Sequence, residues 1–408
     1  MTPGEPRSVL IVGASLAGYS TARALRKQGF DGRVVLVGDE VERPYDRPAL
    51  SKDYLLGTVS EADLSLEPES EGLGAEWILG RRAVALDVAG GVVTLAGGEQ
   101  LSGDAVVVAT GSRARTLPGA VPRAMAGVHT VRTLNDARSL RAELLPGARL
   151  VVIGAGFIGA EIASTARSRG LNVTVVEAAE IPFGGPLGPQ VGAAVAGLHA
   201  RHDVSMTVGV AVRGLVGKER VTGVELSDGR ILDADAVVVG IGALPNVEWL
   251  AGSHLAVAQG LLGDSMGRTN APNVFGVGDC SAWFDVDFDR HHRIEHWTES
   301  RDRPAAMVEA ILGRHDPAAP PTPLRAPYFW SEQYGVRIQF AGRRHGDERV
   351  TFEAGSPEGL DLLAVYWRVD DPVAVLGMNQ PRAFTTWRRS LSANPAHRDP
   401  VLKSKEFV

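Results

Sequence analysis

Short apolar runs open the chain, each followed by a glycine turn and an amphipathic stretch. The run Val9–Val12 ends at Gly13, and a helical pattern continues through Ala24 and Lys27. A second apolar run follows at Val34–Val37. The order strand, glycine turn, helix, strand predicts a βαβ unit.

The same order recurs later, with an apolar run at Leu150–Ile153, glycines within Gly154–Gly159, a helical pattern ending near Arg169 and a run at Val173–Val176. Alternating strands and helices predict an α/β fold whose parallel sheets carry helices on both faces. We therefore expect two Rossmann-like dinucleotide-binding domains. Later strands of these domains are predicted at two further apolar runs, Val106–Val108 and Ala236–Val239.

Two proline-containing stretches, Ser112–Pro122 and Pro317–Pro327, are predicted to be extended linkers. After the second stretch the pattern changes. Strands rich in aromatic and β-branched residues are predicted at Arg337–Ala341 and Leu362–Val369, and a helix near Phe384–Leu391. These elements predict a third, small C-terminal α+β domain.

Composition supports a soluble protein of several domains. A chain of 408 residues is too long to fold around one hydrophobic core. Its content of 44% hydrophobic and 22% charged residues is ordinary for a globular protein. A net charge of -6 argues against nucleic acid as a partner. Met1–Ser8 lacks the features of a signal peptide. Prolines and glycines interrupt the longest uncharged stretch, Ile181–Ala200, so we expect no membrane span and a cytoplasmic location.

The single cysteine, Cys280, excludes an intramolecular disulfide framework and a cysteine-built metal site. We interpret it as a small buried thiol. His292 and His296 have i, i+4 spacing, and His199 and His202 lie three apart. With no neighbouring cysteine, we predict packed or solvated histidines and no metal site.

The first glycine turn, Gly13–Gly18, is typical of a loop whose backbone N–H groups and helix N-terminus meet a pyrophosphate. Ser15 stands at the middle glycine position. Its side chain limits how closely the backbone can approach a phosphate, but its hydroxyl can donate a hydrogen bond to that phosphate. Asp39 or Glu40, at the end of the next strand, would accept hydrogen bonds from an adenosine ribose.

The second turn, Gly154–Gly159, keeps all three glycines, and Glu177 closes the next strand. A carboxylate there suits a free ribose 2′-hydroxyl and repels a 2′-phosphate, and no Arg or Lys lies between Ala178 and His199. We predict a preference for NADH over NADPH above about tenfold. Two such turns require two dinucleotides, for which FAD and NAD make chemical sense. The glycines alone leave their order open.

Further segments, in the same order, are similar to motifs of the FAD-dependent pyridine nucleotide-disulfide oxidoreductase superfamily. Within it, the chain resembles the NADH-dependent ferredoxin reductases, the putidaredoxin-reductase-like group, over essentially its whole length. The segments are Arg43–Lys52, Ala109–Gly111, Val131–Asp136, Gly240–Asn246, Val277–Cys280, Arg293–Trp297 and Phe329–Gln333.

The resemblance implies a glutathione-reductase-like arrangement with FAD on the first turn and NAD on the second. It implies an FAD-binding domain at 1–115 and 248–324, an NAD-binding domain at 116–247 and a C-terminal reductase domain at 325–408. The implied FAD-binding residues are Gly13, Ser15, Leu16, Ala17, Gly18, Asp39 (ribose), Glu40, Arg47, Lys52 and Val84 (along the flavin), Ala109, Thr110, Gly111, Arg132, Asp279 (ribityl chain) and Trp297 (pyrimidine end). The implied NAD-binding residues are Gly154, Gly156, Phe157, Ile158, Gly159, Glu161, Glu177, Gly242 and Trp330 (near the nicotinamide).

Lys52 is one of 5 lysines (27, 52, 218, 403, 405) among 42 basic residues, in a segment otherwise built with arginines. This choice suggests a need for a compact ammonium. By resemblance, Lys52 pairs with Glu161 beside the reactive flavin edge and stabilises negative charge on reduced flavin. We predict both as catalytic residues. Relatives often carry arginines soon after the acid at Glu177, but Ile181 and Gly185 stand there, which bears on NAD affinity.

Relatives that use redox-active cysteines carry them near the flavin or shortly after the first ribose acid, and Cys280 occupies neither place. A flavin without a catalytic thiol suits a one-electron acceptor. We therefore predict an NADH:ferredoxin oxidoreductase that reduces a [2Fe-2S] ferredoxin, which feeds a cytochrome monooxygenase or ring-hydroxylating dioxygenase. The alternatives are a rubredoxin or quinone reductase, and an NADH redox sensor resembling apoptosis-inducing factor.

Ferredoxins of this type are acidic, so a basic docking surface on a monomer or weak homodimer is expected. The candidate arginines are Arg301, Arg303, Arg314, Arg343, Arg344, Arg382, Arg388 and Arg389.

Overall fold

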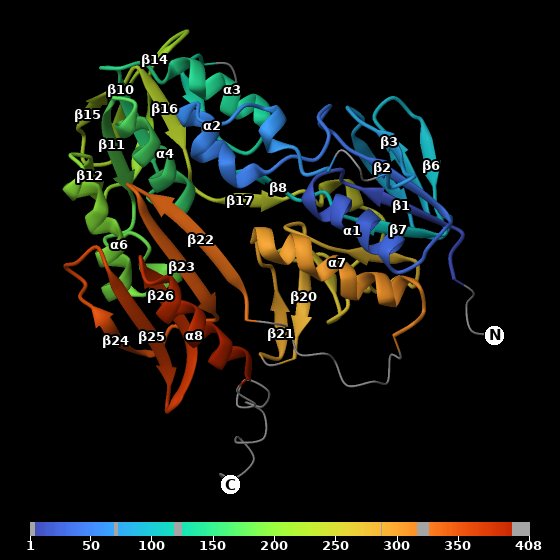
Figure 1. The fold of residues 1–408 in the computed structure, drawn as a ribbon. Helices are drawn as coiled ribbons and strands as arrows, with labels where there is room; N and C mark the ends of the chain where they lie inside the picture. The colour runs from blue at the N-terminus through green and yellow to red at the C-terminus, as the bar shows by residue number, and fades with distance from the viewer. Residues whose placement is uncertain (1–4, 69–71, 118–124, 287, 316–325, 394–408) are drawn as a thin grey trace.

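The computed structural model describes residues 5–68, 72–117, 125–286, 288–315 and 326–393. Figure 1 shows two lobes: one holds the N-terminal β1 and α1 together with α7 (Trp297–Ile311), and the other holds residues 128–239 and the C-terminal sheet. The predicted α/β fold with two parallel sheets and a C-terminal α+β unit is confirmed.

The first parallel sheet begins with β1 (Ser8–Val12), α1 (Leu16–Lys27) and β2 (Arg33–Val37), as the apolar runs predicted. Its order is β19-β7-β1-β2-β3, so a late segment completes a sheet begun at the N-terminus. The other strands are β3 (Glu76–Ile78), β7 (Ala105–Val108) and β19 (Val274–Gly276). Two smaller sheets accompany it. One is antiparallel and consists of β4 (Ala83–Asp87), β5 (Val92–Leu95) and β6 (Gln100–Ser102). The other is mixed: β20 (Ser281–Asp285) pairs in parallel with β18 (Leu261–Gly263) and antiparallel with β21 (Arg290–His292).

The second parallel sheet has the order β12-β11-β10-β16-β9 and contains the second predicted βαβ unit. That unit is β10 (Arg149–Ile153), α4 (Phe157–Ser168) and β11 (Asn172–Glu177). The remaining strands are β9 (Val128–His129), β12 (Ser205–Val208) and β16 (Ala236–Val239). Around it lie α3 (Leu134–Glu143), α5 (Gly184–Leu187), α6 (Pro189–Arg201) and the antiparallel β13 (Val212–Gly217), β14 (Val221–Leu226) and β15 (Ile231–Asp233).

The connection between the lobes is partly a strand pair. β8 (Ser112–Ala114) pairs antiparallel with β17 (Ala243–Pro245), and Figure 1 shows the pair between the lobes. The linker predicted at Ser112–Pro122 therefore begins with β8, whose backbone groups are hydrogen-bonded to β17. Residues 118–124 lie outside the described part, as do 316–325 of the other linker. Short elements nearby are η1 (Arg47–Ser51), α2 (Asp53–Leu56), η2 (Ala62–Leu64) and η3 (Glu248–Leu250). After β21 comes α7 (Trp297–Ile311), which packs beside α1.

The C-terminal unit is an antiparallel sheet of order β22-β23-β26-β25-β24 with one helix, α8 (Pro381–Ala393). Its strands are β22 (Tyr328–Gln333), β23 (Val336–Gly342), β24 (Arg349–Gly355), β25 (Leu362–Arg368) and β26 (Asp371–Met378). The strands and helix predicted in this region are confirmed.

The turn between β22 and β23 anchors this unit on α4 and α6. The Tyr334 backbone N–H donates to Ser164 Oγ (2.7 Å), and the Tyr334 hydroxyl lies 2.7 Å from His199 Nδ1. The His202 ring stacks on Tyr334 with centroids 4.4 Å apart. These contacts fix the position of β22, which lines the candidate site, relative to α4.

The anchor predicts a pH dependence of stability. Burial, with a smaller contribution from His202, lowers the pKa of His199 to about 4. The unfolded chain takes up a proton near pH 6.5 that the folded protein binds only near pH 4, so the free energy of unfolding falls as pH drops through that window. We expect His199 to account for a loss of about 2 kcal/mol between pH 7 and pH 5.

Urea unfolding of His199→Gln at both pH values measures this contribution, because the variant should show a smaller pH-dependent change. The matched control is His254→Gln, which replaces an exposed histidine and should retain the full change. Equal pH dependence in all three proteins would contradict the assignment.

Candidate functional site

A cavity of about 1540 Å³ lies among the three units and is lined by the first glycine turn, the start of α4 and β22. Pockets for drug-sized ligands span roughly 300–1,000 Å³, so the space suits more than one such ligand. A second hollow of about 410 Å³ lies at the second turn beside Glu177. The two share Gly156, Gly240 and Gly242, which places both turns on one continuous surface.

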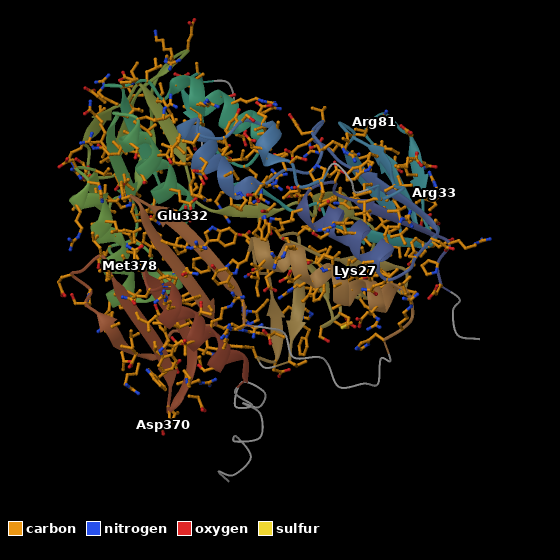
Figure 2. The ribbon with its side chains drawn as sticks, viewed as in Figure 1. Lys27, Arg33, Arg81, Glu332, Asp370 and Met378 are labelled. Carbon is orange, nitrogen blue, oxygen red and sulfur yellow. The ribbon has the colours of Figure 1, made fainter. Side chains whose placement is uncertain are left out.

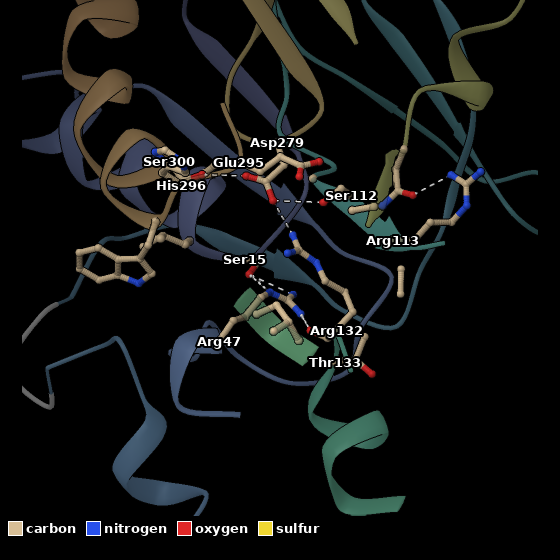
Figure 3. Close-up of a pocket in the computed structure, with 18 of the residues that line it drawn as sticks. Ser15, Arg47, Ser112, Arg113, Arg132, Thr133, Asp279, Glu295, His296 and Ser300 are labelled. Atoms are coloured by element: carbon tan, nitrogen blue, oxygen red, sulfur yellow. Dashed lines mark hydrogen bonds and ion pairs between the residues drawn. The ribbon is translucent and has the colours of Figure 1, made fainter. Parts of the chain in front are cut away.

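The first turn needs its outer glycines for packing. A Cβ on Gly13 would lie 2.1 Å from the Ala109 carbonyl oxygen, and one on Gly18 would lie 1.8 Å from the Gly13 carbonyl oxygen. Ser15, at the middle position, accepts hydrogen bonds from Arg47 Nη2 (3.1 Å) and Nε (3.2 Å), as Figure 3 shows. The hydroxyl therefore holds a guanidinium over the turn and keeps its own hydrogen for another acceptor.

The two acids after β2 have different surroundings. Glu40 accepts hydrogen bonds from Arg47 and the Tyr45 hydroxyl, and burial is the main cause that raises the pKa of Tyr45. The Asp39 carboxylate is 66% exposed, with an ion pair to Arg82 at 3.7 Å. Both acids line the cavity, and Asp39 is the one whose carboxylate retains surface for a ribose.

Asp279 is the centre of a buried polar cluster. Its Oδ2 accepts from Arg132 Nη2 (2.8 Å) and Ser112 Oγ (3.1 Å), and its Oδ1 from Ser300 Oγ (3.4 Å), as Figure 3 shows. The structure thus brings together Arg132 and Asp279, which were each predicted to bind FAD. The two serines, which come from β8 and α7, were not predicted from the sequence.

Trp297, at the start of α7, donates from Nε1 to Asp46 Oδ1 (2.8 Å). Burial raises the pKa of Asp46, while the indole hydrogen bond and the charge of Lys52 oppose that rise. Val84 is 46% exposed and lines the same cavity. Asp46 was not among the predicted residues, although it lies inside the motif Arg43–Lys52.

The predicted pairing of Lys52 with Glu161 is present. Lys52 Nζ lies 2.9 Å from Glu161 Oε2, and the two side chains are only 12% and 4% exposed. Glu161 also accepts hydrogen bonds from Ser51 Oγ and Ser331 Oγ. Sequence analysis did not identify either serine. All three donors come from outside α4, the helix that carries Glu161.

Aromatic and apolar side chains line the rest of the cavity. The Phe157 ring lies between Phe183 (4.9 Å) and Phe329 (4.7 Å), measured between centroids. Trp330 meets Trp297 edge to face at 5.9 Å. Ile158, next to Phe157, leaves 47% of its surface exposed toward this space. A flat apolar ring system fits such walls.

The second turn combines tight packing with an open middle position. A Cβ on Gly154 would lie 2.4 Å from the Gly240 carbonyl oxygen, and one on Gly159 would lie 2.1 Å from the Gly154 carbonyl oxygen, whereas one on Gly156 would meet nothing within 4 Å. Glu177 accepts from the backbone N–H groups of Ala155 and Ala179, each at 2.8 Å. The turn therefore has room for a close phosphate, beside a carboxylate in a fixed position.

An arginine from the C-terminal unit reaches the segment after Glu177. Arg344 Nη1 donates to the Gly185 carbonyl oxygen (3.0 Å), and its Nε lies 3.4 Å from Glu348. An arginine that is distant in sequence thus contacts the segment in which relatives carry arginines, with Glu348 beside its guanidinium.

Eight arginines were predicted to lie on the docking surface, and for three of them this prediction is wrong because their side chains are buried. Their side chains are 8%, 13% and 12% exposed, because each is held within the protein by a carboxylate: Arg303 by Glu299, Arg343 by Asp285 and Arg344 by Glu348. Arg314 pairs with Glu5 at 2.9 Å. Five surface candidates remain: Arg301, Arg314, Arg382, Arg388 and Arg389.

Most other predicted residues also line the two hollows. They are Leu16, Ala17, Thr110, Gly111, Gly242 and Trp330. Gly18 and Gly159 line neither and act through packing. Within the described ranges, no three His, Cys, Asp or Glu side chains are arranged to hold a metal ion, and none of the helices there is long and apolar enough to cross a membrane.

Two Rossmann-like units that share one surface, with a lysine–glutamate pair in its wall, define an oxidoreductase with two dinucleotide sites. The comparisons agree. The model of the pyridine nucleotide-disulphide oxidoreductase family matches residues 7–303, and the reductase C-terminal family matches 328–405. The chain belongs to the pyridine nucleotide-disulphide oxidoreductase family, and its cofactors are FAD and NAD(H).

Similar proteins cover nearly the whole chain. The ferredoxin reductase component of chlorobenzene dioxygenase from Cupriavidus sp. (strain PS12) is 37% identical over 95% of this chain and 93% of its own. Putidaredoxin reductase of Pseudomonas putida is 34% identical over 92% and 90%. The crystal structure of a covalent putidaredoxin reductase–putidaredoxin complex matches with a TM-score of 0.90 and 32% identity, over 95% and 93% of the two chains.

Proposed function

We propose that this enzyme is an NADH:ferredoxin oxidoreductase whose acceptor is a [2Fe-2S] ferredoxin that supplies a cytochrome monooxygenase or a ring-hydroxylating dioxygenase. The structural observation that carries the proposal is the position of Cys280, the only cysteine. It is fully buried, its Sγ faces the Val108 and Val277 carbonyl oxygens, and burial raises its pKa. A thiol relay is therefore excluded. Relatives named as ferredoxin reductase components of dioxygenase systems support the same acceptor class.

We further propose that FAD occupies the larger cavity and NAD extends from it over the second turn to Glu177. Arg47 would place positive charge at the FAD pyrophosphate, and Asp39 would accept from the adenosine ribose. Asp279 would hold the ribityl chain. These assignments follow the charge and exposure of the cavity wall. We place the domain divisions, as predicted, at 1–115 with 248–324, 116–247 and 325–408.

Bound FAD supplies the conversion between the two-electron donor NADH and a one-electron acceptor. The chain supplies position and charge. Lys52, held by Glu161, puts a cation in the cavity wall that favours negative charge on the flavin ring system. The apolar surfaces of Phe157, Phe329 and Ile158 exclude water from the same space.

Stopped-flow reduction of the purified holoenzyme by NADH, followed by mixing with a [2Fe-2S] ferredoxin, tests the proposal. Fast loss of flavin absorbance and fast recovery on mixing are expected. Fast loss with a persistent charge-transfer band and no recovery would contradict it in favour of an NADH sensor. If the flavin absorbance recovered only on mixing with rubredoxin or a quinone, that acceptor would replace ferredoxin in the proposal.

We propose that ferredoxin docks over an aromatic cluster flanked by two arginines. Arg301 lies over Trp297 (4.9 Å), and Arg388 lies over Tyr328 (4.1 Å). Trp330 contacts both aromatic rings, at 5.9 and 6.0 Å. Because Trp297 and Trp330 also line the cavity, this surface offers cations for an acidic partner next to a short path to the flavin.

Reversing charge on this surface is expected to slow ferredoxin reduction at low ionic strength by about tenfold, since electrostatic steering raises association rates. The variant is Arg301→Glu/Arg388→Glu, measured by second-order ferredoxin reduction against salt concentration. The control is Arg33→Glu, an exposed, singly paired arginine in the opposite lobe from Asp370 and Met378 (Figure 2). The proposed docking surface would be contradicted if the wild-type rate of ferredoxin reduction did not depend on salt, or if the control variant lost as much of that rate as the double variant.

We propose a cytoplasmic protein that is a monomer or weak homodimer, as the sequence predicted. Size-exclusion chromatography with light scattering, across a hundredfold range of concentration, measures the oligomeric state directly. A stable higher oligomer would contradict this part of the proposal.

A further inference from the structure

Glu161 accepts hydrogen bonds from three side chains that come from two separate parts of the chain. Its carboxylate is almost completely buried, with the residue 3% exposed. Lys52 Nζ and Ser51 Oγ both bind Oε2, and Ser331 Oγ binds Oε1 at 2.7 Å. The first two donors come from the N-terminal part and the third from β22 of the C-terminal sheet. One carboxylate on α4 thus joins all three structural units.

The donor direction at Ser331 follows from its second partner. Gln333 Nε2 donates to Ser331 Oγ at 3.1 Å, and both residues are buried, at 0% and 1% exposure. A hydroxyl has a single hydrogen. Because the amide occupies a lone pair of the oxygen, the hydroxyl hydrogen points to Glu161 Oε1. The carboxylate plane is therefore held with Oε2 directed at Lys52.

The same helix face holds the neighbouring backbone in place. Glu161 and Ser164 lie at i and i+3 on α4, and they bind Ser331 and Tyr334 of the β22 hairpin. One residue further, Thr165 Oγ1 donates to the Ser51 carbonyl oxygen at 2.9 Å. The donors on both sides of Glu161 are thus fixed relative to α4, as positioning a buried ion pair requires.

We propose that Ser331, oriented by Gln333, is a positioning residue through which the C-terminal domain fixes the Glu161–Lys52 pair and thereby sets the reduction potential of the bound flavin. The proposal rests on the proposed function, in which Lys52 lies beside the flavin. Removing the hydroxyl leaves Oε1 a buried acceptor and lets the carboxylate rotate, which moves the ammonium away from its place in the cavity wall. The fully oxidised flavin is then favoured.

The test is the midpoint potential of the FAD holoenzyme, measured by dye equilibration with a chemical reductant between pH 6 and 8.5. We expect Ser331→Ala to shift the flavin reduction equilibrium about tenfold toward the oxidised form, which is about 30 mV for a two-electron couple. Ser331→Thr keeps a hydroxyl and should restore the wild-type potential. The matched control is Ser253→Ala, which removes a buried serine hydroxyl whose hydrogen bonds are to backbone groups close in sequence, the Leu250 carbonyl oxygen and the Leu255 N–H.

A wild-type potential in Ser331→Ala, with only its melting temperature lowered, would overturn the proposal and leave a structural role. If Ser331→Ala does not fold, Gln333→Met is the alternative, because it keeps the serine but removes the amide that orients its hydroxyl. We expect the midpoint potential to shift in the same direction. An unshifted potential would overturn the proposal. Dye equilibration needs neither NADH nor ferredoxin, so failure of this proposal is distinguished from failure of the proposed function, which would appear in the stopped-flow experiment.

Discussion

Replacing Lys52 with alanine is expected to slow reduction of the bound flavin by NADH about a hundredfold, since removing one preorganised charge or donor at a reacting centre costs rates of this order. The Lys52 side chain is 12% exposed, so little solvent screens its charge. Removing it also makes the flavin potential more negative, because a cation beside the ring favours added negative charge. Stopped-flow kinetics and the midpoint potential measure the two effects.

The substitution has a structural cost that must be separated from its chemical effect. Breaking a buried ion pair leaves an uncompensated carboxylate, which costs about 3–5 kcal/mol. The double variant Lys52→Met/Glu161→Gln removes both charges and should recover stability without recovering the rate. Lys27→Ala removes an exposed lysine from the end of α1 and is the control for lysine loss. Unchanged potential and hydride-transfer rate in Lys52→Ala would refute the catalytic role.

Local patterns were sufficient to predict the parallel sheets. The runs Val9–Val12 and Leu150–Ile153 lie in fully buried central strands, where nearly every residue is apolar on both faces. The glycines after each run have a specific role, since Gly13 and Gly154 each lie against the carbonyl group of a neighbouring segment. Signals of this kind depend only on residues close in sequence.

Contacts between units were not predictable in the same way. Ser331 reaches Glu161 across 170 positions, and Arg344 reaches Gly185 across 159. No periodicity or spacing within one segment encodes such a pair. The docking arginines illustrate the converse error: Arg303 was assigned to the surface from its charge alone, but Glu299 one helical turn earlier holds it inside the protein.

Glu177 gives the other large expected effect, on cofactor choice. Its two oxygens accept from Ala155 and Ala179, so the carboxylate cannot turn away from the hollow that it lines. A 2′-phosphate placed there would meet a fixed negative charge, at a cost of several kcal/mol. The wild-type enzyme should therefore favour NADH over NADPH by more than about tenfold in kcat/KM.

Glu177→Gln should reduce that preference at least about tenfold, because it removes the repulsion of a 2′-phosphate and weakens the hold on the ribose hydroxyls. Adding Ile181→Arg, at a position 40% exposed in the same segment, supplies a cation and should favour NADPH further. Glu180→Gln removes an exposed charge nearby and is the control. The measurement is kcat/KM for both nucleotides with one acceptor. Similar wild-type efficiency with NADH and NADPH would show that Glu177 does not select the cofactor, and an equal effect of Glu180→Gln would assign the change to net charge.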